Sequence, residues 1–135
     1  MIIIVRIGII GSKGWQSRRK LQDILRKLKT LDEPVTVLGQ GGTEGAGAMV
    51  KKLCIAMGLD YAEYNPSYSG HNLYSAMPES YFGKQYHFTQ LLHRMTLLAD
   101  SCDKMIVLLN GDIDPQIKAA IKRANKRDIP VVILE

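Results

Sequence analysis

Five apolar, strand-like runs alternate with four helix-like patterns along this chain, and this alternation is the strongest constraint on its fold. The runs are short and rich in Ile, Val and Leu, which is typical of strands buried on both faces; they lie at 2–10, 35–38, 59–64, 104–109 and 130–134. Alternating strands and helices form a parallel sheet through right-handed crossovers. We therefore predict an α/β fold, a single Rossmann-like three-layer domain over residues 1–135 with a five-stranded parallel sheet.

Local signals predict where the helices between these runs begin and end. Apolar residues recur at helical spacing at Leu21, Ile24, Leu25 and Leu28, so the first helix begins near Ser17 and ends before Pro34. The second follows a glycine-rich segment and stops at Gly58. The third covers about 83–102, and the fourth opens at Asp114-Pro115, an N-cap followed by a proline.

Composition excludes several classes of protein. The hydrophobic fraction of 46% and charged fraction of 23% are ordinary for a soluble domain. No apolar run reaches the roughly 18 residues of a membrane span. The apolar N-terminus lacks the basic leader of a signal peptide. Cys54 and Cys102 fall at apolar helical positions, which favours buried free thiols over a disulfide or metal site. We expect a cytoplasmic protein with no metal, no cofactor and no membrane partner.

The net charge of +5 is modest and its basic residues are dispersed. They cluster at 18–29 and 118–127, each time interleaved with an apolar helical stripe. Solvated helix faces are the favoured interpretation, and a nucleic-acid surface is the alternative.

In sheets of this kind ligands bind where the strands end at their carboxyl termini, near the switch in strand order. Three predicted strand-end loops are therefore candidates: Gly11–Trp15, Gly39–Gly47 and Asn110–Asp112. The second of them is the most informative, with five glycines between a buried strand and a helix. Such a loop lets backbone N–H groups approach a phosphate at the helix N-terminus, and a turn that needs glycine only for packing is the alternative.

The glycine segment matches neither of the common nucleotide-binding fingerprints. It lacks the G-x-G-x-x-G pattern with a downstream acidic residue, and Ala48-Met49 stand where a P-loop has lysine and a hydroxyl residue. Thr43 is expected to cap the following helix and to offer its hydroxyl to the same anion.

Other side chains are expected beside this loop. Ser12 would face it across the site, and Trp15 would either stack on a base or pack locally. Arg94 lies between Leu91 and Met95 at the edge of an apolar helix face, where it would bind phosphate or carboxylate, or snorkel along the surface. His87 and His93 flank the same helix. Residues 61–88 hold eight aromatic residues, which suits either a lid or a protein interface.

Taken together, these motifs resemble the SLOG superfamily, which includes DprA, the LOG phosphoribohydrolases and small YspA-type proteins. LOG enzymes carry G-G-G-x-x-G-x-M-G where this chain has Gly39–Gly47. Their third helix has an arginine nine residues before an aspartate, a spacing kept by Arg94 and Asp103. YspA-like proteins have Arg-Asn at the position of this arginine, so Arg94 matches their arginine and Met95 differs from their asparagine. The resemblance spans nearly the whole chain.

One departure concerns catalysis. LOG enzymes have P-G-G-x-G-T-x-x-E after the fourth strand, and that glutamate takes part in cleaving the N-glycosidic bond. Here the segment reads Leu109-Asn-Gly-Asp-Ile-Asp-Pro-Gln-Ile117, in which Gly111 matches and Ile117 replaces the glutamate. The resemblance thus implies that the ligand-binding half of the site is present and that its catalytic glutamate is absent, with Glu44 or Asp112 as substitute carboxylates.

We expect a protein that senses or sequesters a nucleotide or NAD-derived molecule, as superfamily members do, some in conflicts between bacteria and phages. The alternatives are a LOG-like nucleoside-monophosphate phosphoribohydrolase and a DprA-like binder of single-stranded nucleic acid. Relatives suggest a homodimer or higher homo-oligomer. The predicted ligand contacts are Gly11, Ser12, Trp15, Gly41, Gly42, Thr43, Glu44, Gly45, Arg94, Asn110 and Gly111.

Overall fold

The computed structural model describes residues 3–42, 44–64 and 88–135. Its five strands form one parallel sheet in the order β3-β2-β1-β4-β5, which confirms the predicted fold class. The strands are β1 (Val5–Gly11), β2 (Val35–Gly39), β3 (Asp60–Glu63), β4 (Lys104–Leu108) and β5 (Val131–Leu134).

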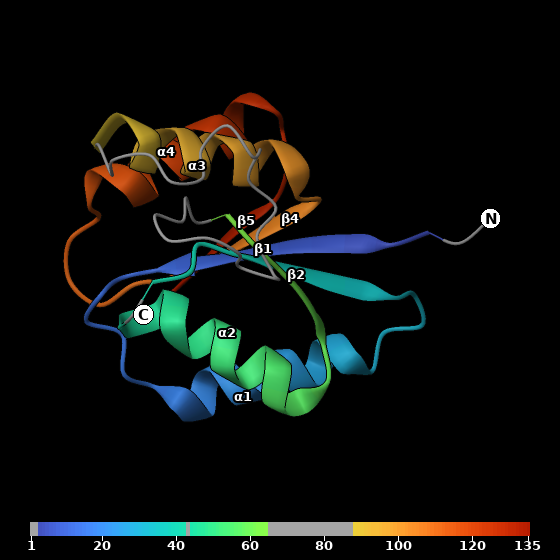
Figure 1. Ribbon diagram of the computed structural model, residues 1–135. Helices are drawn as coiled ribbons and strands as arrows, with labels where there is room; N and C mark the ends of the chain where they lie inside the picture. Colours follow the sequence, from blue (N-terminus) through green and yellow to red (C-terminus); the bar gives the residue numbers. More distant parts are fainter. Residues whose placement is uncertain (1–2, 43, 65–87) are drawn as a thin grey trace, which may run out of the picture.

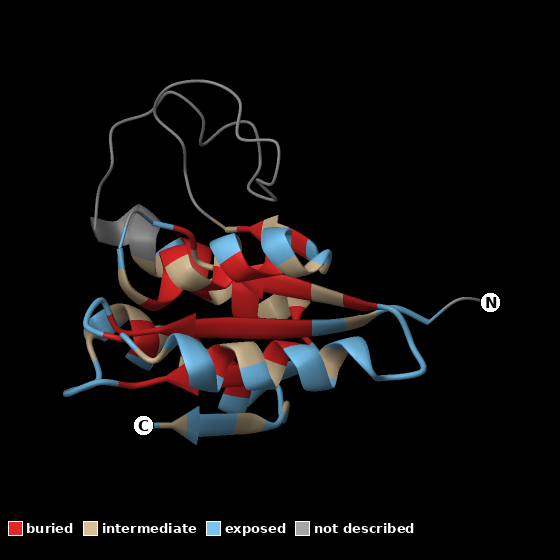
Figure 2. Cartoon of the chain, turned by 90° about the horizontal axis from the view of Figure 1, so that it is seen from below, coloured by how far each residue is buried: buried red, intermediate tan, exposed pale blue. Residues whose placement is uncertain are grey.

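Helices cover both faces of this sheet in a three-layer arrangement (Figure 1). α1 (Arg18–Lys29) and α2 (Gly45–Met57) lie on one face, and α3 (Phe88–Ser101) and α4 (Pro115–Lys126) lie on the other. Each face has its own apolar cluster, because alternate strand residues point to opposite sides. Ile9 and Leu108 belong to the cluster under α1 and α2, whereas Ile10 and Val107 belong to the cluster under α3 and α4. Figure 2 shows the buried residues concentrated along the central strands.

The strand order switches direction at β1. The chain passes from β1 to β2 and β3 on one side, and then returns to place β4 on the other side of β1. Gly11 at the end of β1 lies beside Leu108 at the end of β4. Loops that leave these two strands diverge to opposite faces, and this divergence opens the crevice where such folds bind ligands.

Most predicted helix ends are confirmed. Ser17 caps α1 by accepting a hydrogen bond from the Lys20 backbone N–H, and Asp114 caps α4 by accepting from Ile117 N at 2.8 Å. Pro115 takes the first helical position, and Gly58 ends α2 with φ of 73°. Both cysteines are free and buried, as expected.

Two boundaries differ from the predictions. α2 begins at Gly45, inside the glycine segment, and its N-cap is Glu44 rather than Thr43, which lies outside the described residues. The cause is close backbone packing that lets the helix start beside the loop after β1. β1 begins at Val5, the first residue opposite β2, so Ile3 and Ile4 before it are exposed.

The described part of α3 starts at Phe88, and the predicted long loop with its aromatic residues, 65–82, lies outside the described residues. None of the described helices is long and apolar enough to cross a membrane.

Candidate functional site

The glycine loop, residues 39–47, has a backbone that side chains would obstruct. Gly41, Gly42 and Gly45 have φ values of 75°, 110° and 71°. A Cβ on Gly41 would lie 2.5 Å from Glu63 Oε1, and one on Gly47 would overlap the carbonyl oxygen of Gly41. Packing therefore requires glycine at these two positions. Gly42 differs, because a Cβ there would meet no atom within 4 Å, so only its backbone conformation requires glycine.

Hydrogen bonds tie the glycine loop to the two other strand-end loops. Ala46 N, in the first turn of α2, donates to Ser12 O at 3.0 Å. Ser12 N donates to Leu108 O, and its Oγ accepts from Asn110 N at 3.0 Å. Asn110 Nδ2 donates to Gly14 O at 2.5 Å. The three loops that the sequence singled out thus meet in one junction at the carboxyl end of the sheet.

Gln40 adds a contact that was not predicted. Its Oε1 accepts from Gly11 N at 2.9 Å and its Nε2 donates to Gly11 O at 3.3 Å. The side chain thereby continues the hydrogen bonding between β1 and β2 beyond their last paired residues, Ile9 and Gly39. An amide between two glycines at a strand end was the signal available in the sequence.

Arg94 lies beneath this junction and is only 7% exposed, so the interpretation as a surface arginine is wrong. Its Nη1 donates to Gln40 O at 2.9 Å, and its Nη2 donates to Gln116 Oε1 at 3.0 Å. One guanidinium therefore joins α3, the glycine loop and the first turn of α4. The arginine reaches the strand ends as predicted, and it supports the backbone of the glycine loop from behind.

A buried carboxylate beside the glycine loop was also missed. Glu63, the last residue of β3, is 1% exposed and forms an ion pair with Lys51 Nζ at 3.4 Å. Tyr61 donates its hydroxyl hydrogen to Glu63 Oε1 at 3.3 Å. Burial raises the pKa of Tyr61 above its ordinary value, and the negative charge of Glu63 raises it further, whereas Arg94 lowers it. The signal was an acidic residue at the end of a strand whose alternation points it inward with Tyr61.

Two aromatic residues lie in the core, whereas the predicted carboxylates and Gly111 lie at the rim of the junction. Trp15 is 4% exposed and packs in the apolar cluster with α1 and α2, so its ring offers no open face to a base. The packing alternative fits this position. Glu44, Gly111 and Asp112 are exposed at the rim of the junction. Tyr61 belongs to the core rather than to an aromatic lid.

The catalytic half implied by the resemblance has no carboxylate at its expected position. Ile117, which stands in place of the glutamate, is 1% exposed and faces the cluster under α3 and α4. The neighbouring Gln116 is the residue that reaches the junction, through Arg94. Within the described ranges, no group of three or more His, Cys, Asp or Glu side chains has an arrangement that would hold a metal ion.

The sequence matches no protein-family model, and no curated protein matches it. Among solved structures, the chain is similar to DNA processing protein A (DprA) from Streptococcus pneumoniae, with a TM-score of 0.60 and 10% sequence identity. The similarity covers 96% of this chain and 58% of the DprA chain. At this identity the comparison shows a shared fold, a Rossmann-like α/β sheet of the kind found in DprA.

Proposed function

We propose that the junction binds the phosphate of a nucleotide or NAD-derived small molecule, and that the protein senses or sequesters this molecule. The observation that carries the proposal is the glycine loop at the N-terminus of α2, in which Gly42 and Glu44 are exposed. Gly42 is exposed and a Cβ there would meet no atom within 4 Å, and no acidic residue lies in the first turn of the helix after its N-cap, Glu44. A helix N-terminus attracts an anion through its N–H groups and its partial positive charge.

The residues around this loop support an anionic ligand. Lys51 forms an ion pair with Glu63, and Arg94 donates to the loop backbone at Gln40 O, so these three ionisable groups around the loop sum to a positive charge. Arg94 acts from within, by holding Gln40 and thus the backbone that would contact the phosphate. On the other side of the junction, Asn110 and Gly111 are exposed and would contact the sugar or a second phosphate. Ser12 fixes Asn110 through its hydroxyl.

Calorimetric titration with AMP, CMP and NAD tests the proposal, with Gly42→Ala as the diagnostic variant. An alanine strains a backbone with φ of 110° and places a methyl group where the ligand would lie. We expect about a tenfold or larger loss of affinity, equivalent to about 1.4 kcal/mol or more.

Gly58→Ala is the matched control at the other end of α2. Gly58 also has a positive φ, 73°, and a Cβ there would likewise meet no atom within 4 Å, but this glycine lies far along the helix from the junction. The substitution should lower stability by about 1 kcal/mol without changing affinity. No binding of any of the three compounds to the wild-type protein, or equal affinities of the two variants, would contradict the proposal.

Incubation of the protein with the same nucleotides distinguishes binding alone from the hydrolase alternative. A LOG-like reaction would release free base from AMP or CMP, which chromatography of the reaction mixture detects. Glu44 and Asp112 are the exposed carboxylates beside the junction. Loss of base release in Glu44→Gln or Asp112→Asn would assign the reaction to that residue. Intact nucleotide after prolonged incubation with the wild-type protein would exclude the hydrolase alternative.

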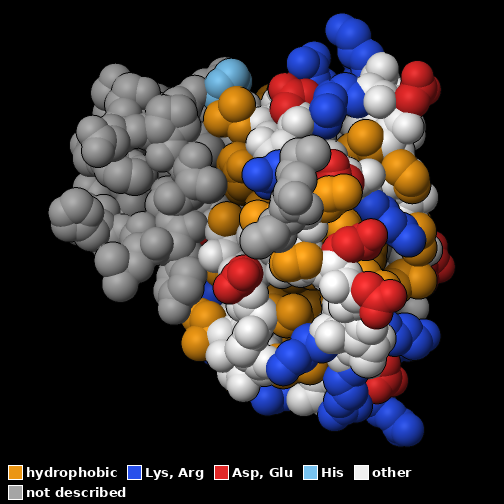
Figure 3. All heavy atoms as spheres, turned by 90° about the vertical axis from the view of Figure 1, so that its right-hand side faces the viewer, with side chains coloured by type: hydrophobic (Ala, Val, Ile, Leu, Met, Phe, Trp, Pro, Cys, Tyr) orange, Lys and Arg blue, Asp and Glu red, His pale blue; other side chains and the backbone are white. Residues whose placement is uncertain are grey.

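Similarity of fold to a DNA processing protein favours single-stranded nucleic acid as a second candidate ligand. Figure 3 shows the face at the amino-terminal ends of the strands, where Lys and Arg gather at two opposite margins with hydrophobic and acidic side chains between them. The described side chains of that face form no continuous basic track. Binding of DNA by another face would weaken steeply as salt rises, because each neutralised phosphate releases counterions.

A further inference from the structure

The two edges of the sheet differ in chemistry. The edge strand β3 has the sequence Asp-Tyr-Ala-Glu and carries an acidic residue at each end. The edge strand β5 has the sequence Val-Val-Ile-Leu and has no charged residue. Edge strands of monomeric proteins are usually blunted by charges, bulges or covering elements, since their free N–H and C=O groups pair readily with another strand. β5 shows none of these protections within its four residues.

Apolar side chains of β5 are exposed on both faces of the sheet. Val131 packs against the cluster under α3 and α4, and Leu134 packs against the cluster under α1 and α2. Alternation therefore places Ile133 on the α4 face and Val132 on the opposite face. Ile133 is 46% exposed and Val132 is 38% exposed. Figure 2 shows the strand as largely exposed at the margin of the molecule. A partner that continues the sheet would cover both faces, whereas a single helix would cover one.

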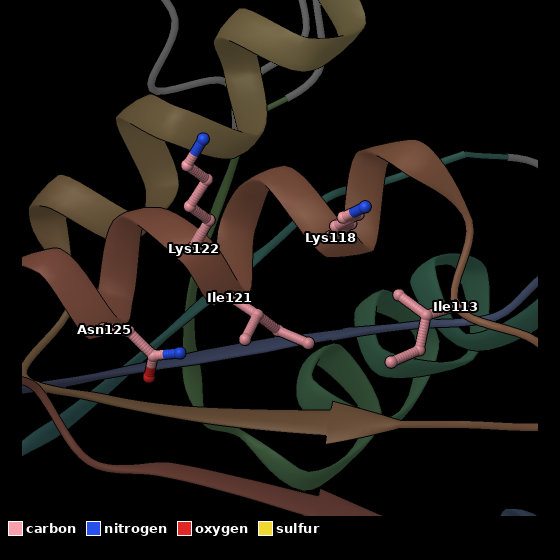
Figure 4. A pocket seen from close by; sticks show the side chains of 5 residues that line it. All are labelled: Ile113, Lys118, Ile121, Lys122 and Asn125. Carbon is pink, nitrogen blue, oxygen red and sulfur yellow. The ribbon is translucent and has the colours of Figure 1, made fainter.

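A shallow groove beside α4 extends the apolar surface on the Ile133 side. It is lined by Ile113, Ile121 and Asn125, with Lys118 and Lys122 alongside. Ile113 is itself 46% exposed. In Figure 4 the side chains of Ile113, Ile121 and Asn125 point toward the strands, and the amine of Lys122 points away from them. The groove can therefore receive apolar side chains without bringing that amine into the contact.

We propose that β5 pairs with β5 of a second copy of this chain, antiparallel, to form one continuous sheet across a two-fold axis. Charge favours this direction. Exposed Lys104, Lys126 and Arg127 outnumber exposed Asp103 and Asp128 at the amino-terminal end of the strand. Exposed Asp112 and Glu135 lie at its carboxyl-terminal end, where Lys20 Nζ donates to the Glu135 carbonyl oxygen. Antiparallel pairing sets the basic end of each copy against the acidic end of the other, and a two-fold interface makes every such contact twice. Parallel pairing would set like charges together.

The interface is small, because one four-residue strand and the groove beside it fall below the standard area of a stable complex. The dimer is accordingly concentration-dependent. This proposal rests on the edge strand and not on the proposed function, although Asp112 and Ile113 at the interface belong to or adjoin the loop after β4 that forms part of the junction.

Sedimentation of the full chain over a wide range of concentration tests the proposal. The wild type should move from monomer to dimer, and Ile133→Lys should weaken dimerisation by about tenfold or more, because a lysine on the edge must be desolvated on pairing. Ile55→Lys is the control, since Ile55 is 47% exposed on α2, away from β5. A monomer at every concentration, or a dimer that Ile133→Lys leaves unchanged, overturns the proposal.

Disulfide trapping tests the same pairing without introducing a charged residue such as the lysine of Ile133→Lys. In a centred antiparallel pair the two-fold axis passes beside residue 132 or 133, so one of them lies opposite its own copy at a Cα separation that a disulfide spans. Val132→Cys or Ile133→Cys should yield covalent dimers on mild oxidation, and Ile55→Cys should not. The native Cys54 and Cys102 are buried and remain outside the reaction. Equal cross-linking at all three positions, or none at 132 and 133, contradicts the pairing.

Discussion

Cys54 illustrates how burial at a single residue becomes a pH dependence of the whole fold. Burial raises the pKa of its thiol from the ordinary 9.0 to about 12, so the unfolded chain loses this proton at a lower pH than the folded protein does. Stability from this group is complete below pH 9 and is lost as pH rises toward 12. The free energy of unfolding should therefore fall by about 2 kcal/mol between pH 8 and pH 10.5 from Cys54 alone.

Urea unfolding of Cys54→Ala at these two pH values checks the effect. The variant should be less stable at pH 8, because it loses buried volume, but its stability should fall less with pH than that of the wild type. Ile55→Ala, on the exposed side of the same helix, should keep the wild-type pH dependence. Identical slopes for Cys54→Ala and the wild type would show that the thiol does not titrate between the two states.

Residues with a strong local signal were found from the sequence, and residues with long-range partners were not. The glycine loop and Arg94 were recognisable because strand-end glycines and an arginine on an apolar helix edge are unusual locally. Gln40 and Gln116 carry no such mark, since their roles depend on contacts with Gly11 and Arg94 that only the tertiary fold creates. For Trp15 the sequence left stacking and packing both open, because its position in a loop hides how deeply it packs.

At the scale of elements, two helix caps provide a direct comparison. Asp114 accepts a hydrogen bond from Ile117 N at 2.8 Å at the start of α4, whereas Glu44 makes no side-chain hydrogen bond to the first turn of α2. Asp114→Ala should lower the free energy of unfolding by about 1 kcal/mol, because it leaves an N–H group of the first turn without its acceptor. Glu44→Ala should change it by only a few tenths. Chemical denaturation followed by circular dichroism measures both, and equal losses would contradict the role of the cap.

Element types were predictable because each strand and helix has its own hydrophobic period, whereas some boundaries depended on neighbours. β1 starts where β2 offers a partner for Val5, although the apolar run begins earlier. α2 starts at Gly45, because Gly45 and Gly47 allow the helix to begin against backbone of the adjacent loops. The hydrophobic periodicity of a segment does not show whether its loop fits sterically against another loop.

At the scale of the whole molecule, the alternation of strands and helices was sufficient to predict the parallel three-layer fold. Handedness and strand order then bring the ends of β1, β2 and β4 together, which is why three loops far apart in sequence meet at one junction. Arg94 links this junction across the layers, since it comes from α3 and contacts both Gln40 in the glycine loop and Gln116 in α4. The cation thus couples the stability of the fold to the shape of the proposed binding site.

A double-mutant cycle measures this coupling. Arg94→Met removes the guanidinium but keeps an apolar stem, and it leaves Gln40 O and Gln116 Oε1 without this donor. We expect a loss of about 1.5–3 kcal/mol for Arg94→Met, as for hydrogen bonds to charged groups, and a smaller loss for Gln116→Ala. If Arg94 and Gln116 are in contact, the double variant loses less stability than the sum of the two single variants, by about 0.5 kcal/mol or more.

Nucleotide affinity separates the structural role of Arg94 from its role in binding. Arg94→Met should weaken nucleotide binding more than Gln116→Ala, which keeps the hydrogen bond from Arg94 to Gln40. If the two losses of stability add strictly and Arg94→Met leaves nucleotide affinity unchanged, Arg94 neither makes a stabilising contact with Gln116 nor supports the binding site.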